Sequence, residues 1–430
     1  MGKSDRIPSA GQLRPREAGV STVVSEKTPS VLCVNGGSSS VIFALYGLDG
    51  SPKALLRGKI DRIGLQNTRI IFEDFRREQK GSDVIGDFDH ASAANFLLKW
   101  LEEKLVFGSV EAIGHRIVNG GWRYKEPQPV TAEMVDEIRR ISAYAPEHLP
   151  SELALIELLG KRLPGLLQVA CFDTAFHREM PQVAKILPLP WKYREQGVER
   201  YGFHGLSFEY LMDELARVAG ADAARGRVIL AHLGNGSSLA AVHNGKGIDT
   251  SMGFTPAAGV PMGTRSGDLD PGLVWYFAQT EQMSANQFHQ MINHQSGLLG
   301  VSGISSDVRE LLEREKDDIR AAEAIALFCY QVKKFIGAYS AALGGLDTLI
   351  FTGGVGENAP AVRERICSGL DFLGIELEKS RNVSNANIIS AEGARVAVHV
   401  MRTDEELMIA KATGRILNRN RSSSTQGLDT

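Results

Sequence analysis

The chain carries one supersecondary pattern twice, and this repeat limits its fold more than any other feature. Residues 31–50 read VLCVNGGSSSVIFALYGLDG, which is a strand, a Gly/Ser bend and a second strand. Residues 228–245 read VILAHLGNGSSLAAVHNG and have the same order, with Gly36 and Gly234 at equivalent positions. Because strand, bend and strand recur at a separation near half the chain, the repeat predicts a duplicated domain.

Both bends predict a place for a phosphate. A bend of glycines and hydroxyl residues leaves backbone N–H groups uncovered, and these bind phosphate oxygens. In the second copy, Asn244-Gly245 predicts a two-residue hairpin turn, which needs positive φ at both positions. An arginine between small residues, Arg265 in GTRSG, follows it, and its fork matches phosphate or carboxylate oxygens. Two such halves predict an α/β, two-lobed nucleotide-binding protein with a cleft between its lobes.

Length and composition agree with this prediction. A chain of 430 residues exceeds one hydrophobic core, so two domains are expected. Hydrophobic residues make up 43%, charged residues 23%, and the net charge is −3, which gives no reason to expect a nucleic acid or a membrane as partner. No apolar run approaches ~18 residues. The four cysteines contain no CxxC pair and predict buried thiols in a reducing compartment, so we expect a cytoplasmic protein.

Two charged side chains belong to predicted strands. Arg116 lies in an apolar strand, where arginine is costly without an anion, and a structural ion pair is the alternative to a ligand. Asp173 directly follows the strand 168–172, and open α/β sheets place their chemistry at such strand ends. Both positions are therefore candidate site residues.

Two histidines and one glycine turn are further candidates. His204 lies between glycines, which indicates either a close approach to a ligand or a simple turn. His148 lies in a loop between two prolines, where a surface residue is the alternative, and Ser151 is predicted as the N-cap of the next helix. The strand 346–352 runs into GGVGEN and then a helix, a common way to hold a nucleotide.

Nine blocks of the chain, in order, resemble the acetate kinase family. They are VNGGSSS (34–40), GHRIVNGG (114–121), CFDTAFH (171–177), RYGFHGLS (200–207), AHLGNGSSLAAV (231–242), DTSMGFTP (249–256), MGTRSGDLDPG (262–272), FTGGVGEN (351–358) and TDEELMIA (403–410). The resemblance implies an α/β, duplicated two-lobe, actin-like (ribonuclease H-like) ATPase fold with an interlobe cleft. It also implies reversible, direct in-line transfer of a phosphoryl group from ATP to acetate with Mg²⁺ or Mn²⁺, and a homodimer.

Matching these blocks residue by residue implies a role for each site residue. The catalytic positions are Asp173, His204 and Arg265, and the acceptor-binding positions are Arg116 and His148. The metal positions are Asn35 and Glu405. The nucleotide-binding positions are His232, Leu233, Gly234, Asn235, Gly236, Asp307, Val308, Arg309, Gly353, Gly354, Val355, Gly356, Glu357 and Asn358.

The chain departs from the family pattern at Ile42, Asn119, Glu147, Leu206 and Phe208. We expect these side chains to lie near the acyl end of the site or the phosphate path, away from the nucleotide segments. Phosphoryl transfer therefore follows more firmly from the resemblance than acetate as the acceptor. The alternatives are an acyl kinase for another short carboxylate, propionate or butyrate, and a catalytically impaired nucleotide-binding homologue.

The predicted domain limits follow the repeat. We expect an N-terminal lobe over 29–172 that includes a returning C-terminal helix, 405–417. The nucleotide-binding C-terminal lobe is expected over 173–404. The polar segments 1–28 and 418–430 are expected to be disordered tails.

Overall fold

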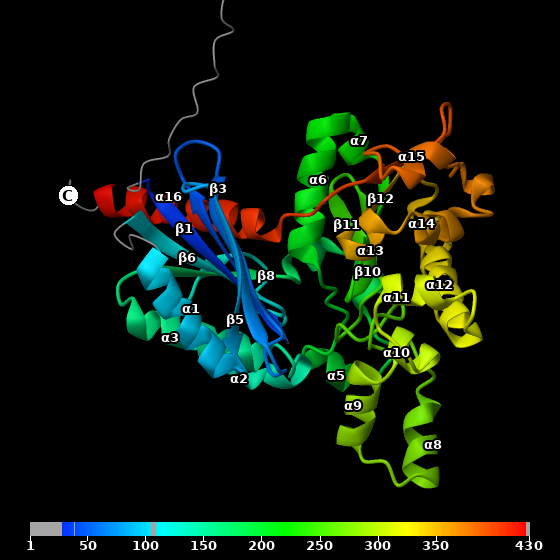
Figure 1. Ribbon diagram of the computed structural model, residues 1–430, viewed down its shortest axis with the longest axis horizontal. Helices are drawn as coiled ribbons and strands as arrows, with labels where there is room; N and C mark the ends of the chain where they lie inside the picture. The colour runs from blue at the N-terminus through cyan, green and yellow to red at the C-terminus, as the bar shows by residue number, and fades with distance from the viewer. Residues whose placement is uncertain (1–27, 38, 105–108, 427–430) are drawn as a thin grey trace, which may run out of the picture.

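Two β-sheets form the framework of the protein (Figure 1). The computed structural model describes residues 28–37, 39–104 and 109–426. In sheet order, the first sheet contains β5 (Gln79–Gly86), β4 (Thr68–Asp74), β3 (Lys53–Asp61), β2 (Ser40–Gly47), β1 (Ser30–Gly36), β6 (Val110–Ile117), β8 (Leu167–Phe172) and β7 (Gln128–Pro129). The second contains β11 (Lys246–Thr250), β10 (Ser237–His243), β9 (Arg227–Leu233), β12 (Thr348–Thr352) and β13 (Ala397–Val400).

The two sheets share one topology of five strands. β1 pairs antiparallel with β2 and parallel with β6, and β6 pairs parallel with β8. In the same way, β9 pairs antiparallel with β10 and parallel with β12, and β12 pairs parallel with β13. β3 and β11 add an antiparallel strand to β2 and β10, respectively. The predicted duplication and α/β fold class are therefore confirmed.

The two predicted bends lie at equivalent places in these sheets. The β1–β2 bend follows the pair Gly36 and Val41, and the β9–β10 bend follows the pair Leu233 and Ser237. The predicted turn after β10 is present, with φ of 53° at Asn244 and 73° at the glycine that follows. Local sequence signals thus determined both hairpins.

Helices cover the sheets. Those before β9 are α1 (His90–Lys104), α2 (Ala132–Arg140), α3 (Leu149–Arg162), α4 (Gln182–Lys185), α5 (Trp191–Glu195), α6 (Gly205–Ala219) and α7 (Ala221–Arg225). Those after β11 are α8 (Gly272–Thr280), α9 (Ala285–His294), α10 (Gly297–Ser302), α11 (Val308–Arg314), α12 (Ile319–Leu343), α13 (Gly353–Asn358), α14 (Pro360–Cys367), α15 (Lys379–Val383) and α16 (Glu405–Gln426). None of the helices in the described ranges combines the length and hydropathy that crossing a membrane requires.

Helices α6 and α16 lie side by side between the sheets (Figure 1). α6 follows β8 of the first sheet and packs its apolar face, including Phe208 and Leu211, on the second sheet. α16 follows β13 of the second sheet and packs Met408 and Ile409 on the first. The first sheet is therefore covered by α16, which follows the second sheet in the chain. The second sheet is covered by α6, which follows the first.

Two local predictions were wrong. α16 does not end at residue 417 but continues to Gln426, so part of the predicted tail 418–430 is helical, and an ion pair of 2.8 Å between Arg421 and Glu111 ties this extension to β6. Ser151 is not an N-cap, because α3 begins at Leu149 with His148 as its cap. The predicted tail 1–28 lies outside the described residues except for Thr28.

Candidate active site

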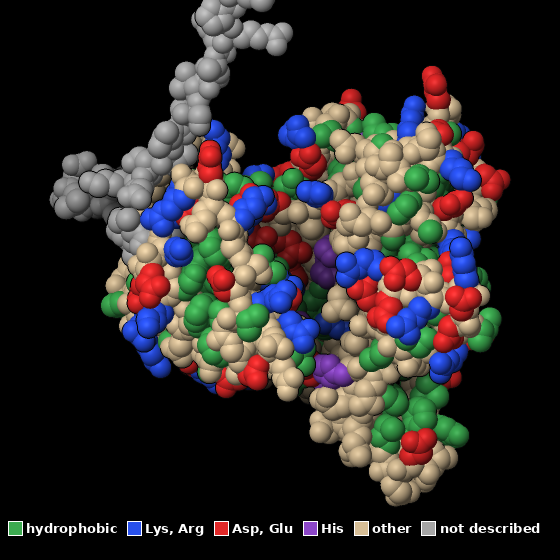
Figure 2. Space-filling view, viewed as in Figure 1, with side chains coloured by type: hydrophobic (Ala, Val, Ile, Leu, Met, Phe, Trp, Pro, Cys, Tyr) green, Lys and Arg blue, Asp and Glu red, His purple; other side chains and the backbone are tan. Residues whose placement is uncertain are grey.

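Two neighbouring cavities share the bend between β9 and β10. The first, called the polar cavity here, has a volume of about 230 Å³ and is lined by side chains from both halves of the chain. The second, called the loop-lined cavity, has a volume of about 460 Å³. Asn235 lines both of them. Figure 2 shows a hollow between the two halves with acidic, basic and histidine side chains around it.

Arg116 enters the polar cavity from the end of β6, held by two partners. Its Nε and Nη2 atoms donate to Asp173 Oδ2 at 3.1 and 2.6 Å, and its Nη1 donates to Asn35 Oδ1 at 3.4 Å. Burial lowers the pKa of Arg116, but the charges of Asp173, Glu405 and Glu152 together outweigh this, and the pKa is raised above its usual value. The ion-pair alternative for Arg116 is therefore correct, and Arg116 also lines the cavity.

Asp173 lies behind Arg116 rather than in the cavity wall. Its side chain is fully buried, and β8 positions it through a bond of 2.9 Å from its N–H to the carbonyl of Ile117. Its Oδ1 atom has no hydrogen-bond partner among the residues described. Asp173 lies beside the predicted site, but in this arrangement it reaches the cavity only through Arg116.

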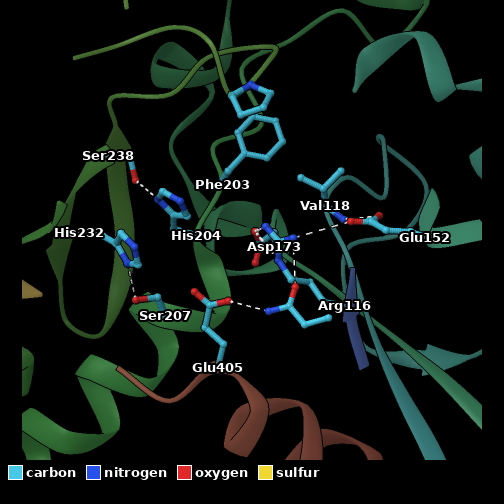
Figure 3. A network of polar contacts seen from close by, with 12 residues as sticks. Arg116, Val118, Glu152, Asp173, Phe203, His204, Ser207, His232, Ser238 and Glu405 are labelled. Carbon is cyan, nitrogen blue, oxygen red and sulfur yellow. Dashed lines mark hydrogen bonds and ion pairs between the residues drawn. The ribbon is translucent and has the colours of Figure 1, made fainter. Parts of the chain in front are cut away.

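His204 and His232 form a stacked pair on the opposite side (Figure 3). Their ring centroids are 4.2 Å apart, His204 Nδ1 lies 2.8 Å from Ser238 Oγ, and His232 Nδ1 lies 2.9 Å from Ser207 Oγ. Burial, together with nearby cationic groups, keeps the pKa of His204 well below its usual value. Burial also lowers the pKa of His232 to about 4. Both imidazoles are therefore neutral at pH 7.

The cationic end of the cavity is completed by Arg265, and the neutral His148 lies near it and Arg116. Arg265 donates to the carbonyl of Pro256 at 3.4 Å and forms no ion pair among the described residues. Burial and the charge of Arg116 lower its pKa below the usual value. His148 is buried rather than on the surface, and burial lowers its pKa to about 3, with Arg116 and Arg265 acting in the same direction. A buried arginine without a carboxylate is suited to an anionic ligand.

An apolar wall faces these cations. The wall consists of four residues from three segments of the chain: Val118, Phe203, Met252 and Pro256. Each lies within or beside a block that resembles the family. Sequence reasoning did not assign them a role, because a single valine or methionine beside a motif resembles any core residue. The cavity thus combines positive charge with a small apolar surface, as a short carboxylate requires.

Asn35 and Glu405 lie together at one side of the polar cavity. Asn35 Nδ2 donates to Glu405 Oε2 at 3.4 Å and to Glu406 Oε1 at 3.2 Å. Burial and the charge of Asp173 raise the pKa of Glu405 above its usual value. Buried oxygen donors, including the unpartnered Oδ1 of Asp173, fit a hard divalent cation. Within the described residues, no cluster of three or more His, Cys, Asp or Glu side chains forms a metal site of its own.

The loop-lined cavity contains most of the predicted nucleotide segments. Its lining residues are Gly234, Asn235, Asp307, Val308, Arg309, Gly354, Val355 and Asn358, with Ser306 and Ala359, which the prediction missed. His232 and Gly236 line the polar cavity instead. Leu233 is buried in the hydrophobic core, because alternate side chains of a strand point away from each other.

The remaining predicted nucleotide residues line neither cavity. They are Gly353, Gly356 and Glu357 in α13. Glu357 Oε1 accepts the N–H of Gly353 at 3.0 Å, which closes the first turn of this helix. Gly353 has φ of 80°, and a Cβ there would lie 2.6 Å from the carbonyl oxygen of Leu233. These residues shape the turn from β12 into α13 rather than its surface.

The five departures from the family pattern do not all lie at the site. Ile42 lines the polar cavity, Glu147 precedes His148, and Asn119 is buried after β6. Leu206 packs under α16 in a hydrophobic cluster with Met408, and Phe208 packs on the second sheet. The expectation was therefore wrong for Leu206, because its direction on α6 is away from the cavity.

Comparison with known proteins identifies the family of the chain. The acetokinase family matches residues 30–411. A propionate kinase from Citrobacter rodentium is 43% identical over 391 residues, which cover 90% of this chain and 96% of the relative. An acetate kinase from Rhodopseudomonas palustris is 42% identical over 396 residues, covering 91% and 99%.

Solved structures give the same result. The crystal structure of a propionate kinase from Francisella tularensis is 36% identical with a TM-score of 0.84, covering 90% of this chain and 99% of its own. That of an acetate kinase from Porphyromonas gingivalis is 38% identical with a TM-score of 0.80, with the same coverage. The chain therefore belongs to the acetokinase family and is a phosphotransferase that acts on a carboxyl group with ATP or ADP and a divalent metal.

Proposed function

We propose that this protein is an acetate kinase, which transfers the γ-phosphoryl group of ATP reversibly to acetate by direct in-line displacement. One observation carries the proposal. Arg116, His204 and Arg265 line one cavity of about 230 Å³, and Asn235 connects its lining to that of the loop-lined cavity. ATP in the loop-lined cavity would direct its terminal phosphoryl toward the acceptor in the polar cavity.

The acceptor needs charge compensation more than a base. A carboxylate is already ionised at neutral pH, so the main obstacle is the repulsion between two anions. Arg116 and Arg265 would supply positive charge to the acceptor and the transferring phosphoryl group. His204 is neutral, so with Ser238 donating to its Nδ1 it would act as a hydrogen-bond donor through Nε2. Asp173 would hold the guanidinium of Arg116 in position.

The metal would be Mg²⁺ or Mn²⁺. Asn35 and Glu405, with Asp173 beside them, offer the oxygen ligands such ions prefer. When bound, the ion would neutralise phosphate charge and orient the phosphate chain. Few protein ligands are needed, because Mg²⁺ usually keeps several waters and binds substrate phosphates.

Propionate is the second candidate acceptor. The similarity to a propionate kinase at 43% identity supports it. The apolar wall, with Val118, Phe203 and Met252, would contact the alkyl group of either acid. Butyrate would require more room at this wall, and each added methylene contributes only about 1–3 kcal/mol of discrimination in such a pocket.

A hydroxamate assay for acyl phosphate, with ATP-Mg²⁺ and carboxylates of two to five carbons, tests the proposal. We expect acyl phosphate from acetate, with kcat/KM highest for acetate or propionate. No acyl phosphate from any acid, with ATP still bound, would contradict the proposal and support a catalytically impaired nucleotide-binding protein.

Self-association is part of the proposal. Helix α8 buries none of its residues, and Trp275 on it is 71% exposed beside exposed Val274 and Tyr276. An apolar patch of this kind supports a homodimer. We expect light scattering to give the mass of a dimer and the variant Trp275→Glu to be monomeric.

The four cysteines are free and buried, which supports the reducing cytoplasm as the location of the protein.

A further inference from the structure

Glu152 is a buried carboxylate to which the proposed reaction gives no role. It lies in the first turn of α3, is 2% exposed and does not line the polar cavity. Burial raises its pKa to about 8, although Arg116 acts in the opposite direction. Burying a carboxylate is costly unless specific partners compensate it. Its contacts therefore indicate why it is there.

Glu152 contacts two residues that line the polar cavity, Val118 and Arg116, without lining it itself (Figure 3). Its Oε2 accepts the backbone N–H of Val118 at 3.0 Å. Its Oε1 lies 3.7 Å from Arg116 Nη1 and has no hydrogen-bond partner in the described part of the chain. Val118 belongs to the apolar wall and Arg116 to the cationic end.

The guanidinium of Arg116 is thus held on two sides. Asp173 accepts from Nε and Nη2, while Glu152 faces Nη1. With both carboxylates in place, the planar group cannot rotate without losing one partner. Removing Glu152 leaves Asp173 Oδ2 and Asn35 Oδ1, at 2.6 and 3.4 Å, as partners of the guanidinium, and we expect Arg116 to move toward them and so away from an acceptor.

Helix α3 fixes Glu152 itself. Its N–H donates to the carbonyl of His148 at 3.1 Å, and the N-terminal turn of a helix favours a negative charge. A Cβ at Gly36 would lie 3.6 Å from Glu152 Cγ, so the β1–β2 bend also packs against it. Glu152 therefore joins three elements that line the site.

We propose that Glu152 is a positioning residue that holds the guanidinium of Arg116 and the backbone of Val118 at the separation required by a short carboxylate. This inference rests on the proposed function. The carboxylate of the acceptor needs the cation, and its alkyl group needs the wall. Because one side chain contacts both, it fixes the position of the guanidinium relative to Val118, whose backbone lies two residues along the chain from Arg116.

Two substitutions separate its two contacts. Glu152→Gln leaves one acceptor oxygen, so it keeps the contact with the Val118 N–H and turns an amide N–H₂ toward Arg116 Nη1, whereas Glu152→Ala removes both contacts. We expect Glu152→Gln to raise the acceptor KM about tenfold, with kcat and the KM for ATP unchanged within about threefold. We expect Glu152→Ala to change the ratio of kcat/KM for propionate over acetate by at least about threefold as well, because Val118 is released.

Glu157→Gln is the matched control, because Glu157 lies on the same helix but is exposed and pairs with Arg139. It should behave as wild type. Acetate binding, measured by calorimetry, gives a second readout that does not depend on turnover. If Glu152→Ala does not fold, Glu152→Gln alone decides whether the contact with Arg116 matters.

An acceptor KM and an acetate affinity of Glu152→Gln within twofold of wild type would overturn the inference. Wild-type acyl phosphate formation separates this failure from failure of the proposed function. A wild-type protein that binds acetate without phosphorylating it would contradict the proposed function, and the binding data would still decide the role of Glu152. A wild-type protein that binds no carboxylate would overturn both.

Discussion

His204 has a backbone conformation that few residues other than glycine adopt. Its φ of 59° and ψ of 25° lie in the left-handed region, at a cost of about 1–2 kcal/mol for a residue with a Cβ. Gly205 follows, and a Cβ there would lie 2.2 Å from the carbonyl oxygen of Asp173. The glycines around His204 thus serve a close approach of α6 to β8, and the strained residue carries the imidazole into the cavity.

The buried histidines give the first prediction at this scale. Burial lowers the pKa of His115 to about 4, below its unfolded value of about 6.5. The unfolded chain therefore binds a proton that the folded protein does not, so the stability is complete above pH 6.5 and is lost as the pH falls toward 4. In wild type, each histidine with a pKa lowered in this way increases the slope of the free energy of unfolding against pH by up to about 1.4 kcal/mol per pH unit.

His115→Leu removes this contribution. We expect its free energy of unfolding, measured by denaturation with urea between pH 4.5 and 7, to fall less steeply with decreasing pH than that of wild type. The slope of the free energy of unfolding against pH tests the prediction, rather than its value at one pH. This is because losing the contact of 2.7 Å between His115 and Gln168 changes the stability at every pH. Equal slopes would contradict the assignment.

At the scale of elements, α9 connects the two lobes at the cavity rim. His294 Nε2 at its end lies 3.2 Å from Glu147 Oε2 in the loop before α3. The same turn holds the Arg265 loop, since Thr264 Oγ1 donates to the carbonyl of Asn293 at 2.8 Å. The contact between His294 and Glu147 therefore ties the loop of His148 to the loop of Arg265.

The pair is partly exposed, which limits its contribution. Exposed ion pairs contribute about 0.2–1 kcal/mol, so we expect Glu147→Gln and His294→Gln each to lower kcat/KM for the acceptor by no more than about fivefold. The double variant should be no worse than either single one, because both remove the same contact. A double-mutant cycle in which the effects add would contradict the interlobe contact.

Elements that neighbouring residues determine were predicted from the sequence better than elements that depend on contacts between distant residues. The turn at Asn244 follows from neighbouring residues and was predicted. The cap of α3 was not, because Pro150 needs no N–H partner and allows the helix to begin earlier. The end of α16 depends on the distant pair Arg421 and Glu111.

The residues of the site likewise differ in whether the sequence alone reveals them. Polar residues between glycines, such as Arg265 and His204, stand out in a sequence, and the family resemblance assigns them a role. Val118 and Glu152 do not stand out, since their contribution arises only when separate elements meet. Only coordinates show that Asp173 reaches the site through Arg116.

For the whole molecule, the two crossing helices explain how the halves are joined. We propose an N-terminal lobe of residues 29–172 and 405–417 and a C-terminal lobe of residues 173–404. This division follows from the packing of the two helices, because α6 follows the first sheet but packs on the second, and α16 follows the second sheet but packs on the first. Lys411 Nζ on α16 lies 2.8 Å from Asp213 Oδ2 on α6. Movement of one lobe against the other would therefore act through these helices.

Gly114 tests this joint. It lies on β6, and a Cβ there would lie 2.4 Å from Ile409 Cγ2 and Thr413 Oγ1 of α16. We expect Gly114→Ala to displace α16 and to lower the free energy of unfolding by about 1–3 kcal/mol. Gly337→Ala is the control, because Gly337 lies inside α12 with open space around it, and alanine there should stabilise by about 0.5–1 kcal/mol. Thermal unfolding of Gly114→Ala equal to wild type would contradict this packing.

The central claim is that cations from both lobes compensate the repulsion between ATP and an incoming carboxylate. The most direct measurement is the turnover of acetate to acetyl phosphate by Arg116→Ala and Arg265→Ala, one from each lobe. Each should lose at least about three orders of magnitude in kcat, with the ADP affinity retained and the fold intact. A kcat within tenfold of wild type for either variant would contradict the claim.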